Sequence, residues 1–183
     1  MLPETLRGDR LALSIPVESD LDRITEYCAD PEFERFLTTP WPYTRAHAES
    51  FVRDFVPRAW EDDTEYTWAV RDDESGPLLG MISWRRRGDL GYWMGAPHRG
   101  RGYTSEAVAI VIEWVFGSGL ATRIGWESFA GNLASARVAQ RAGFTFTGTG
   151  PLDQPARDGS HPDGWHAVLG RDDDRSVKDG WPL

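Results

Sequence analysis

Apolar and polar residues alternate along several short stretches of the chain and follow a helical period along others. Strands are predicted where this alternation occurs or where a short apolar run is closed by turn residues. Helices are predicted where apolar residues recur every three to four positions. The predicted strands are residues 10–15, 66–71, 78–84, 89–94, 123–127, 144–147 and 165–169, and the predicted helices are residues 19–30, 44–57, 104–116 and 132–142.

For two of these helices the sequence also predicts burial or the position of a break. The helix at 104–116 is apolar nearly all round, so we expect it to lie deep in the core. The helix at 44–57 ends in Pro57, which we expect to kink or stop it, because proline lacks the N–H that an inner turn requires.

The elements follow the order strand, two helices, three strands, helix, strand, helix and two strands. This order predicts a mixed α/β sheet with a strand–helix–strand crossover in its middle. A length of 183 residues is that of one domain, which we expect to span residues 1–183. The charged residues 171–183 are expected to form a mobile tail.

The composition argues against several classes of protein. Hydrophobic residues make up 40% of the chain and charged residues 27%, which is typical of a globular domain. No stretch approaches the roughly 20 apolar residues of a membrane span, and Met1–Arg10 has no apolar signal-peptide core. Cys28 is the only cysteine, so an intrachain disulfide and a cysteine-based zinc site are excluded. We therefore expect a cytoplasmic protein with no metal and no membrane partner.

The net charge of −9 argues against a nucleic-acid partner, because the surface as a whole repels polyanions. A cationic or amine-bearing partner is easier to accommodate. The acidity is equally consistent with a role in solubility alone.

The strongest chemical signal is the segment Arg99-Gly100-Arg101-Gly102-Tyr103-Thr104, between a predicted strand and the apolar helix. Glycines let the backbone turn tightly and approach a ligand closely. Successive N–H groups in such a turn, followed by a helix N-terminus, form a site for an anion such as pyrophosphate. A tight turn without a ligand is the alternative. No Lys-Ser/Thr pair follows, which argues against a P-loop, and the third glycine of a dinucleotide fingerprint is missing.

Three segments resemble the GNAT superfamily of N-acetyltransferases, and within it the branch of the ribosomal-protein acetyltransferases RimJ and RimL. Their order along the chain is that of the family, and the resemblance covers about residues 6–171. The segments are Pro40-Trp41-Pro42-Tyr43-Thr44, then Leu90-Gly91-Tyr92-Trp93-Met94 with His98 to Ala107, then Asn132-Leu133-Ala134-Ser135 with Ala142-Gly143-Phe144.

The resemblance implies the GNAT fold, a mixed and mostly antiparallel sheet with a V-shaped splay and flanking helices. Acetyl-CoA, the acetyl donor, would lie in the splay between the strands at 90–95 and 123–127. The Asn132 side chain would bond to its pantetheine arm, or only cap its own helix. The backbone of Trp93, Met94 and Gly95 would pair with the same arm, and the pyrophosphate would be held by Arg99, Gly100, Arg101, Gly102, Tyr103 and Thr104.

The implied reaction is direct attack of an amine on the thioester. It needs a base, a donor for the oxyanion, and an acid or dipole for the leaving thiolate. A strand N–H near Met94 would serve the oxyanion. Ser135 matches the RimL-like position for protonating the thiolate, with a small, packed helix residue as the alternative. Asp89 is the preferred base, and Glu127, His98 and His166 are further candidates, each equally consistent with a surface residue.

The chain also departs from the family pattern. Pro97 replaces the frequent Gln or Arg before the glycine loop, and Ala167 replaces an Asp of the last strand. Val138 and Ala139 occupy the stretch where many members carry a tyrosine that acts on the sulfur. These departures affect the proton-transfer residues more than cofactor binding.

The acceptor side is the least typical part of the sequence. Four aromatic residues are predicted to line a flat cleft, although each alone is more often a core residue: Trp41, Tyr43, Trp84 and Trp165. The predicted function is N-acetyl transfer to a primary amine, such as a protein or peptide N-terminus. The alternatives are a small amine (an amino acid, polyamine or antibiotic) and a non-catalytic CoA-binding sensor. The resemblance also allows a homodimer.

Overall fold

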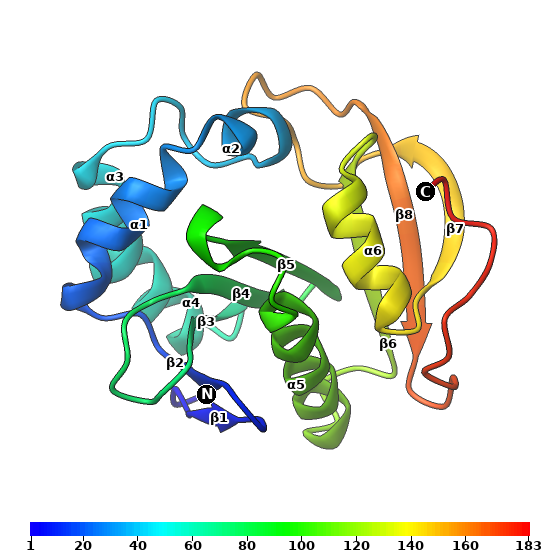
Figure 1. The fold of residues 1–183 in the computed structure, drawn as a ribbon, viewed down its shortest axis with the longest axis horizontal. Coiled ribbons are helices and arrows are strands. Elements are labelled where there is room, and N and C mark those ends of the chain that lie inside the picture. Colours follow the sequence, from blue (N-terminus) through cyan, green and yellow to red (C-terminus); the bar gives the residue numbers. More distant parts are fainter.

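The computed structural model describes residues 1–183 and contains one sheet of eight strands, in the order β1-β2-β3-β4-β5-β6-β8-β7 (Figure 1). The predicted mixed α/β sheet is therefore confirmed. Its strands are β1 (Leu6–Arg7), β2 (Ala12–Ser14), β3 (Glu65–Arg71), β4 (Gly80–Arg85), β5 (Asp89–Met94), β6 (Arg123–Phe129), β7 (Thr145–Pro151) and β8 (Asp163–Gly170).

Six α-helices and three short turns of other helical types connect the strands. The α-helices are α1 (Leu21–Cys28), α2 (Pro31–Phe36), α3 (Arg45–Ser50), α4 (Val56–Glu61), α5 (Tyr103–Gly117) and α6 (Leu133–Arg141). The 3-10 turns are η1 (Glu18–Asp20) and η3 (Ala96–His98), and the π-helical turn is η2 (Phe51–Phe55). None of these helices has the length and apolar character that crossing a membrane would take.

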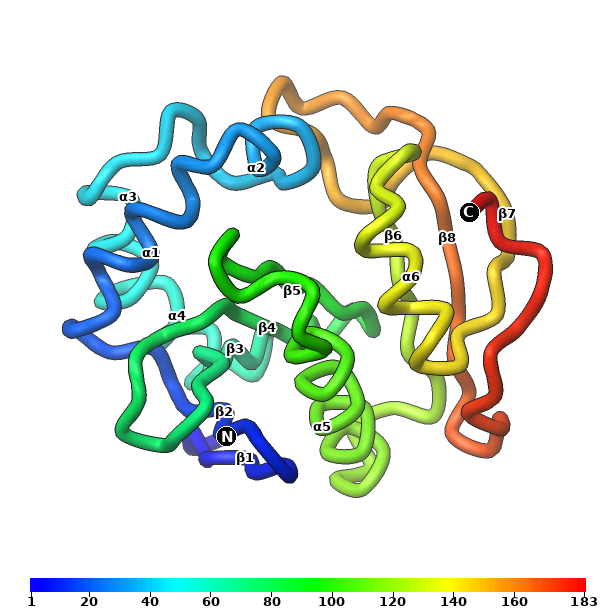
Figure 2. The backbone as a smooth tube through the Cα atoms, in the orientation of Figure 1, coloured from blue at the N-terminus to red at the C-terminus, as the bar shows by residue number.

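The sheet opens between β5 and β6. These two strands are parallel and pair only at Asp89 and Gly125, whereas every other neighbouring pair is antiparallel. Beyond that pair they diverge, which gives the expected V-shaped splay. The backbone trace shows the β1–β5 half and the β6–β8 half standing apart, with α5 and α6 between them in this view (Figure 2).

The larger core lies where α5 packs on one face of the sheet. Val111 and Val115 of α5 are fully buried, as the apolar sequence of this helix predicts. Three tryptophans fill the space between helix and strands, and each is at most 1% exposed: Trp60, Trp68 and Trp84. A smaller core on the opposite face joins α1 and α3 to β4, and Cys28 is buried there.

Two prolines lie in the first turn of a helix, and of the kink or stop expected at Pro57 only the stop is contradicted. Pro31 begins α2, which the sequence analysis missed, because the first helical position needs no N–H donor and Asp30 caps the helix through the Glu32 N–H. Pro57 does not end its helix, which continues as α4 to Glu61. The preceding π-helical turn, in which the Val56 N–H donates to the Phe51 carbonyl, makes room for the proline ring.

The C-terminal residues 171–183, expected to be mobile, lie against the β6–β8 half. The Arg171 N–H donates to the Thr122 carbonyl at 2.9 Å, and Gln140 donates to the Lys178 carbonyl at 3.0 Å. The Trp181 ring packs on Trp126 of β6, with the ring centroids 5.4 Å apart. The segment thus places an aromatic ring beside a residue of the sheet interior.

We expect Trp181→Ala to lower the free energy of unfolding by about 1–3 kcal/mol, because the lost ring is only partly buried. Urea unfolding followed by tryptophan fluorescence measures this change. Val177→Ala is the matched control, since the Val177 side chain is 59% exposed and should contribute little. Equal stability of the Trp181 variant and the wild type would show that the segment is mobile in solution.

Candidate active site

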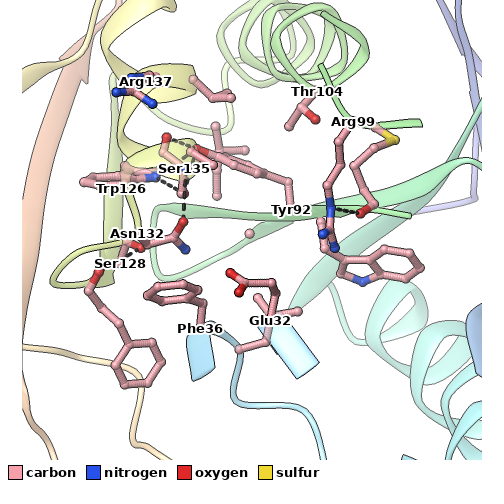
Figure 3. A pocket seen from close by; sticks show the side chains of 18 of the residues that line it. Glu32, Phe36, Tyr92, Arg99, Thr104, Trp126, Ser128, Asn132, Ser135 and Arg137 are labelled. Carbon is pink, nitrogen blue, oxygen red and sulfur yellow. Dashed lines mark hydrogen bonds between the residues drawn. The ribbon is translucent and has the colours of Figure 1, made fainter. Parts of the chain in front are cut away.

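A cavity of about 500 Å³ occupies the opening between β5 and β6. We call it the first cavity. The glycine loop, β5 and the start of α6 form its walls (Figure 3). Of the predicted cofactor residues, those that line it are Trp93, Met94, Arg99, Gly100, Gly102, Tyr103, Thr104 and Asn132. Gly95 and Arg101 do not line it, whereas Ser135 does.

The glycine loop has the backbone shape that the sequence predicts. Gly100 and Gly102 have φ angles of +74° and +79°, a region that residues with a Cβ rarely adopt. Gly102 directly precedes α5, whose first-turn N–H groups have no partner within the helix. A Cβ at Gly100 would meet no atom within 4 Å, so the space beside the loop is open. The loop and helix end can therefore receive an anionic group.

Arg99 connects the loop to α2. Its Nε donates to the Met94 carbonyl at 3.0 Å, and its Nη2 lies 2.8 Å from Asp30 Oδ2. The guanidinium also lies over the Phe33 ring. Arg99 therefore holds α2 beside the cavity, and the nearby carboxylate offsets part of its charge.

Two cationic residues of this cavity were missed in the sequence analysis. Arg137 and Arg141 of α6 line it, are exposed, and form no ion pair within the chain. Their spacing of four residues, which places both on one helix face, is the signal that identifies them. They add positive charge opposite the glycine loop.

The backbone of β5 alternates its direction along the opening. The Gly95 N–H donates to the Leu79 carbonyl at 2.9 Å, so Gly95 is directed toward β4 and away from the cavity. Because directions alternate along an antiparallel pair, Trp93 also bonds toward β4, whereas Tyr92 and Met94 are directed toward the opening. The backbone groups that face the opening are therefore those of Tyr92 and Met94, and not those of Trp93 and Gly95 that the sequence analysis expected.

Ser135 belongs to a compact polar cluster. Its Oγ lies 3.2 Å from the Tyr92 hydroxyl and accepts a hydrogen bond from Trp126 Nε1 at 3.2 Å. The Tyr92 hydroxyl donates to the Ser135 carbonyl at 3.0 Å and accepts from Trp126 Nε1 at 2.9 Å. Burial raises the pKa of Tyr92 above its usual value, so it keeps its proton. Figure 3 shows the three side chains converging on one wall of the cavity.

Tyr92 has no role in the sequence-based prediction, although it belongs to a motif segment there. Its alternation with Leu90 and Met94 places it on the α5 face of β5 and could have identified it. Asn132 caps α6, because its Oδ1 accepts the Ser135 N–H at 3.2 Å. Its side-chain NH₂ group remains available to the cavity that Asn132 lines.

The carboxylate favoured as the base lies at the closed end of the splay. Asp89 accepts hydrogen bonds on both oxygens, from Arg85 and from Arg87, and lines neither this cavity nor the second one described below. Glu127 lines the first cavity, and it accepts from Arg87 and from the backbone N–H groups of Asp153 and Gln154. Asp89 is thus placed as a structural ion-pair partner rather than as a base.

The two histidines proposed as further bases have other contacts. His98 lies 3.0 Å from the Tyr27 hydroxyl, and burial together with Arg101 and Arg23 lowers the pKa of this histidine. His166 Nε2 lies 3.2 Å from the Gly150 carbonyl, and His166 lines neither cavity. No three His, Cys, Asp or Glu side chains come together as a group suited to a metal ion.

A second cavity of about 410 Å³ lies on the other face of the sheet, beneath α1, α3 and η2. It shares Arg85, Gly91, Tyr92 and Trp93 with the first cavity, among other residues, so the two meet across β5.

Of the four aromatic residues predicted for the acceptor, only Tyr43 lines the second cavity. Trp41 and Trp165 line neither cavity. Trp84 is a correction, because it is 1% exposed and stacks on Tyr66 in the core, with ring centroids 5.8 Å apart.

This fold and site define a class of transferase. Residues 10–145 match the family described as "Acetyltransferase (GNAT) domain", so the chain belongs to the GNAT family and is an acetyl-CoA-dependent N-acetyltransferase. A relative, the uncharacterized N-acetyltransferase YoaA of Bacillus subtilis (strain 168), is 25% identical over 145 residues. That match covers 76% of this chain and 81% of YoaA.

Two solved structures show the same fold. RimL, a ribosomal L7/L12 alpha-N-protein acetyltransferase in complex with coenzyme A, has a TM-score of 0.79 at 18% identity, covering 93% of this chain and 100% of RimL. The microcin C7 self-immunity acetyltransferase MccE, in complex with acetyl-CoA and AMP, has a TM-score of 0.75 at 18% identity, covering 89% of this chain and 93% of MccE. At these identities the likeness establishes the architecture.

We expect Gly102→Glu to weaken CoA binding about 100-fold or more, because it adds backbone strain and a negative charge to the anion site. Isothermal titration calorimetry with CoA measures the affinity. Gly119→Glu is the matched control, since Gly119 follows α5, has a φ of +68° and faces open space. Unchanged affinity in the Gly102 variant would contradict the loop assignment.

Proposed function

We propose that acetyl-CoA occupies the first cavity and that a small primary amine reaches its thioester through the second cavity. The observation that carries this proposal is the shared wall of the two cavities at Gly91, Tyr92 and Trp93 of β5. A donor and an acceptor that occupy opposite sides of one strand can meet there without sharing a path. The cytoplasmic location and a homodimer stay predictions.

The first cavity suits the donor. The open space at Gly100, the unpaired N–H groups of α5, and Arg137 and Arg141 fit the phosphates of CoA. The outward-directed backbone groups of Tyr92 and the Met94 N–H fit a pantetheine arm laid along β5 like an added strand, whereas the Met94 carbonyl already accepts from Arg99. RimL and MccE, which share the fold, were solved with CoA and with acetyl-CoA, and this supports CoA as the ligand of the fold.

The residues around the junction supply the parts that acetyl transfer needs. A β5 N–H, from Tyr92 or Met94, donates to the oxyanion that forms when the amine attacks the thioester carbonyl. In the cluster as it stands, Tyr92 donates its proton to the Ser135 carbonyl and Ser135 donates to the Tyr92 hydroxyl, so each hydroxyl turns from these partners to donate to the sulfur as the carbon–sulfur bond breaks. The ammonium loses one proton to water in the second cavity before it attacks; the nitrogen loses a second as the amide forms, and the thiolate takes up one proton through the hydroxyl cluster and leaves as the CoA thiol. Tyr92 thereby takes the role of the tyrosine that many family members carry on the helix, in the stretch where this chain has Val138 and Ala139.

The connection between β7 and β8 forms a strap that joins the two halves of the sheet. This strap favours a small acceptor over a long chain laid across the site. Arg157 of this connection donates to four carbonyls around the end of α2, those of Phe33, Glu34, Leu37 and Thr39, at 2.6–2.7 Å. Figure 1 shows the connection reaching across to α2. A peptide N-terminus inserted end-on is the second candidate acceptor, and the likeness to RimL favours it.

The test of the proposal is release of free CoA thiol from acetyl-CoA with a panel of small amines and of N-terminal peptides. Turnover of small amines supports the proposal. Turnover of peptides alone assigns the acceptor to the second candidate. CoA binding without turnover of any amine would leave a non-catalytic sensor and overturn the proposal.

We expect Ser135→Ala and Tyr92→Phe each to lower kcat about 10- to 100-fold, because each removes a donor to the leaving sulfur. CoA affinity should stay within about twofold, since neither hydroxyl holds the phosphates. Single-turnover rates and calorimetry measure the two effects. Ser118→Ala, at the exposed end of α5, is the control. Wild-type kcat in both variants would remove the cluster from the mechanism.

The pH dependence gives an independent check. Burial raises the pKa of Tyr92, so its protonated form, the hydrogen-bond donor, persists to higher pH than in a free tyrosine. Tyr92 should therefore stay protonated between about pH 7 and about pH 10. We expect no decline in kcat over this range that depends on Tyr92. A kcat–pH profile that declines near pH 9 in the wild type but not in Tyr92→Phe would contradict this expectation.

A further inference from the structure

The floor of the second cavity carries a short polar row within largely apolar surroundings. Glu65 and Thr67 of β3 and Ser83 of β4 project from the same sheet face into it, and Thr67 is the cross-strand partner of Ser83. The facing wall is aromatic, with Phe51 and Phe55 of η2 stacked at 5.5 Å. Phe55 is 45% exposed, which places this pair toward the mouth of the cavity.

The polar row lacks partners within the protein. Thr67 is 1% exposed, and its Oγ1 forms no hydrogen bond. Buried hydroxyls are normally bonded, so an unpaired one that lines a cavity indicates an occupant with a polar group. Thr39, at the other side of the same cavity, also has a buried Oγ1 without a partner.

Glu65 gives this site its charge. It is the only acidic side chain that lines the second cavity, and it forms no ion pair within the chain. The cation beside it, Arg85, is held by Asp89 through Nε at 3.0 Å and Nη2 at 2.7 Å. Among the other titratable groups of the lining, His47 caps α3 through the Thr44 N–H, and burial raises the pKa of Cys28 to about 12 and that of Tyr43 above its usual value. The Glu65 carboxylate thus remains available for a ligand.

One carboxylate, two hydroxyls and an aromatic wall match the needs of an alkylammonium group. An ammonium has three N–H donors and no acceptor, so it requires several oxygens around it. Ring faces add attraction for a cation. The net charge of −9 would also draw a cationic substrate toward the protein.

The position of the site separates it from the reacting centre. β3 and β5 are two strands apart, which corresponds to about 10 Å across the sheet. An amine that reacts beside Gly91 therefore cannot be the one bound between Glu65 and Thr67. The group at Glu65 has to be a second positive charge, carried by the same molecule on a flexible chain.

We propose that the acceptor is a primary amine with a second ammonium group at the far end of an aliphatic chain, and that Glu65 and Thr67 bind this second ammonium. This inference rests on the proposed function. The shared chemistry has two sources, a free diamine or polyamine and the lysine side chain of a short peptide. Monoamines lack the second ammonium that Glu65 and Thr67 bind, so they bind more weakly.

The experiment compares acceptors that differ only in the second charge. The pairs are 1,8-diaminooctane with 1-aminooctane, and Lys-containing dipeptides with their norleucine counterparts. We expect a KM about tenfold lower for the dication of at least one pair, with similar kcat. The pair that shows the difference identifies the source. Equal KM values in both pairs would overturn the inference, whereas absence of turnover with every amine would instead overturn the proposed function.

Variants of the site test the same point. Glu65→Gln should raise KM for the dication about tenfold and leave KM for the monoamine unchanged, because only the former uses the carboxylate. Thr67→Val, which keeps the side-chain shape, should raise the dication KM by a smaller factor. Glu61→Gln, an equal charge change on the exposed end of α4, is the control. Thermal unfolding and CoA affinity verify that each variant is folded, and equal effects of Glu65→Gln on both amines would refute the assignment.

Discussion

The parting of β5 and β6 after one residue pair determines the rest of the structure. At that pair Asp89 accepts hydrogen bonds from Arg85 at the end of β4 and from Arg87 in the β4–β5 turn, and Arg87 continues to Glu127 of β6 at 2.9 Å. These charges tie three strands together where the opening begins. Carboxylates and guanidiniums that are paired and hydrogen-bonded on all sides tolerate such partial burial, whereas an unpaired charge there would be costly. Asp89 therefore serves as an ion-pair partner that holds the strands together, and not as a base.

The sequence predicts the helices and strands well. It predicts less well on which face of the sheet a side chain lies. Alternation and glycine spacing located the buried α5, the loop at Gly100 and Gly102, and every strand except the two-residue β1, because these signals are local. Trp84 was misplaced because Met81, Ile82 and Trp84 are apolar on both faces of β4, so the pattern cannot tell which side meets α5. Asp89 was misassigned because its ion-pair partners depend on the turn and on the β5–β6 register. The second cavity combines β3, β4 and η2, which only the tertiary fold brings together.

The C-terminal segment is connected to the site through a chain of contacts. Trp181 packs on Trp126, and Trp126 donates from the same indole to Tyr92 and Ser135. The contact with Trp181 supports the Trp126 ring in the orientation that directs its N–H at the two hydroxyls. Hydroxyl groups have freely rotating protons, so a fixed donor between them restricts which way each proton points. The last residues of the chain thus contribute to the order of a cluster that lies on the other side of β6.

Charge is distributed in a way that the net value of −9 conceals. Arg137, Arg141 and the N-terminus of α5 border the first cavity, which Glu32 and Glu127 also line, whereas the second cavity has a single carboxylate, Glu65. Screening in salt solution limits the reach of surface charges to about 10 Å, so each cavity responds mainly to its own lining. An acidic protein can therefore hold a polyanionic donor on one face of β5 and attract a cationic acceptor on the other. In the proposed arrangement β5 separates the two ligands, and its backbone N–H groups at the opening lie beside the place where the acetyl group would pass between them.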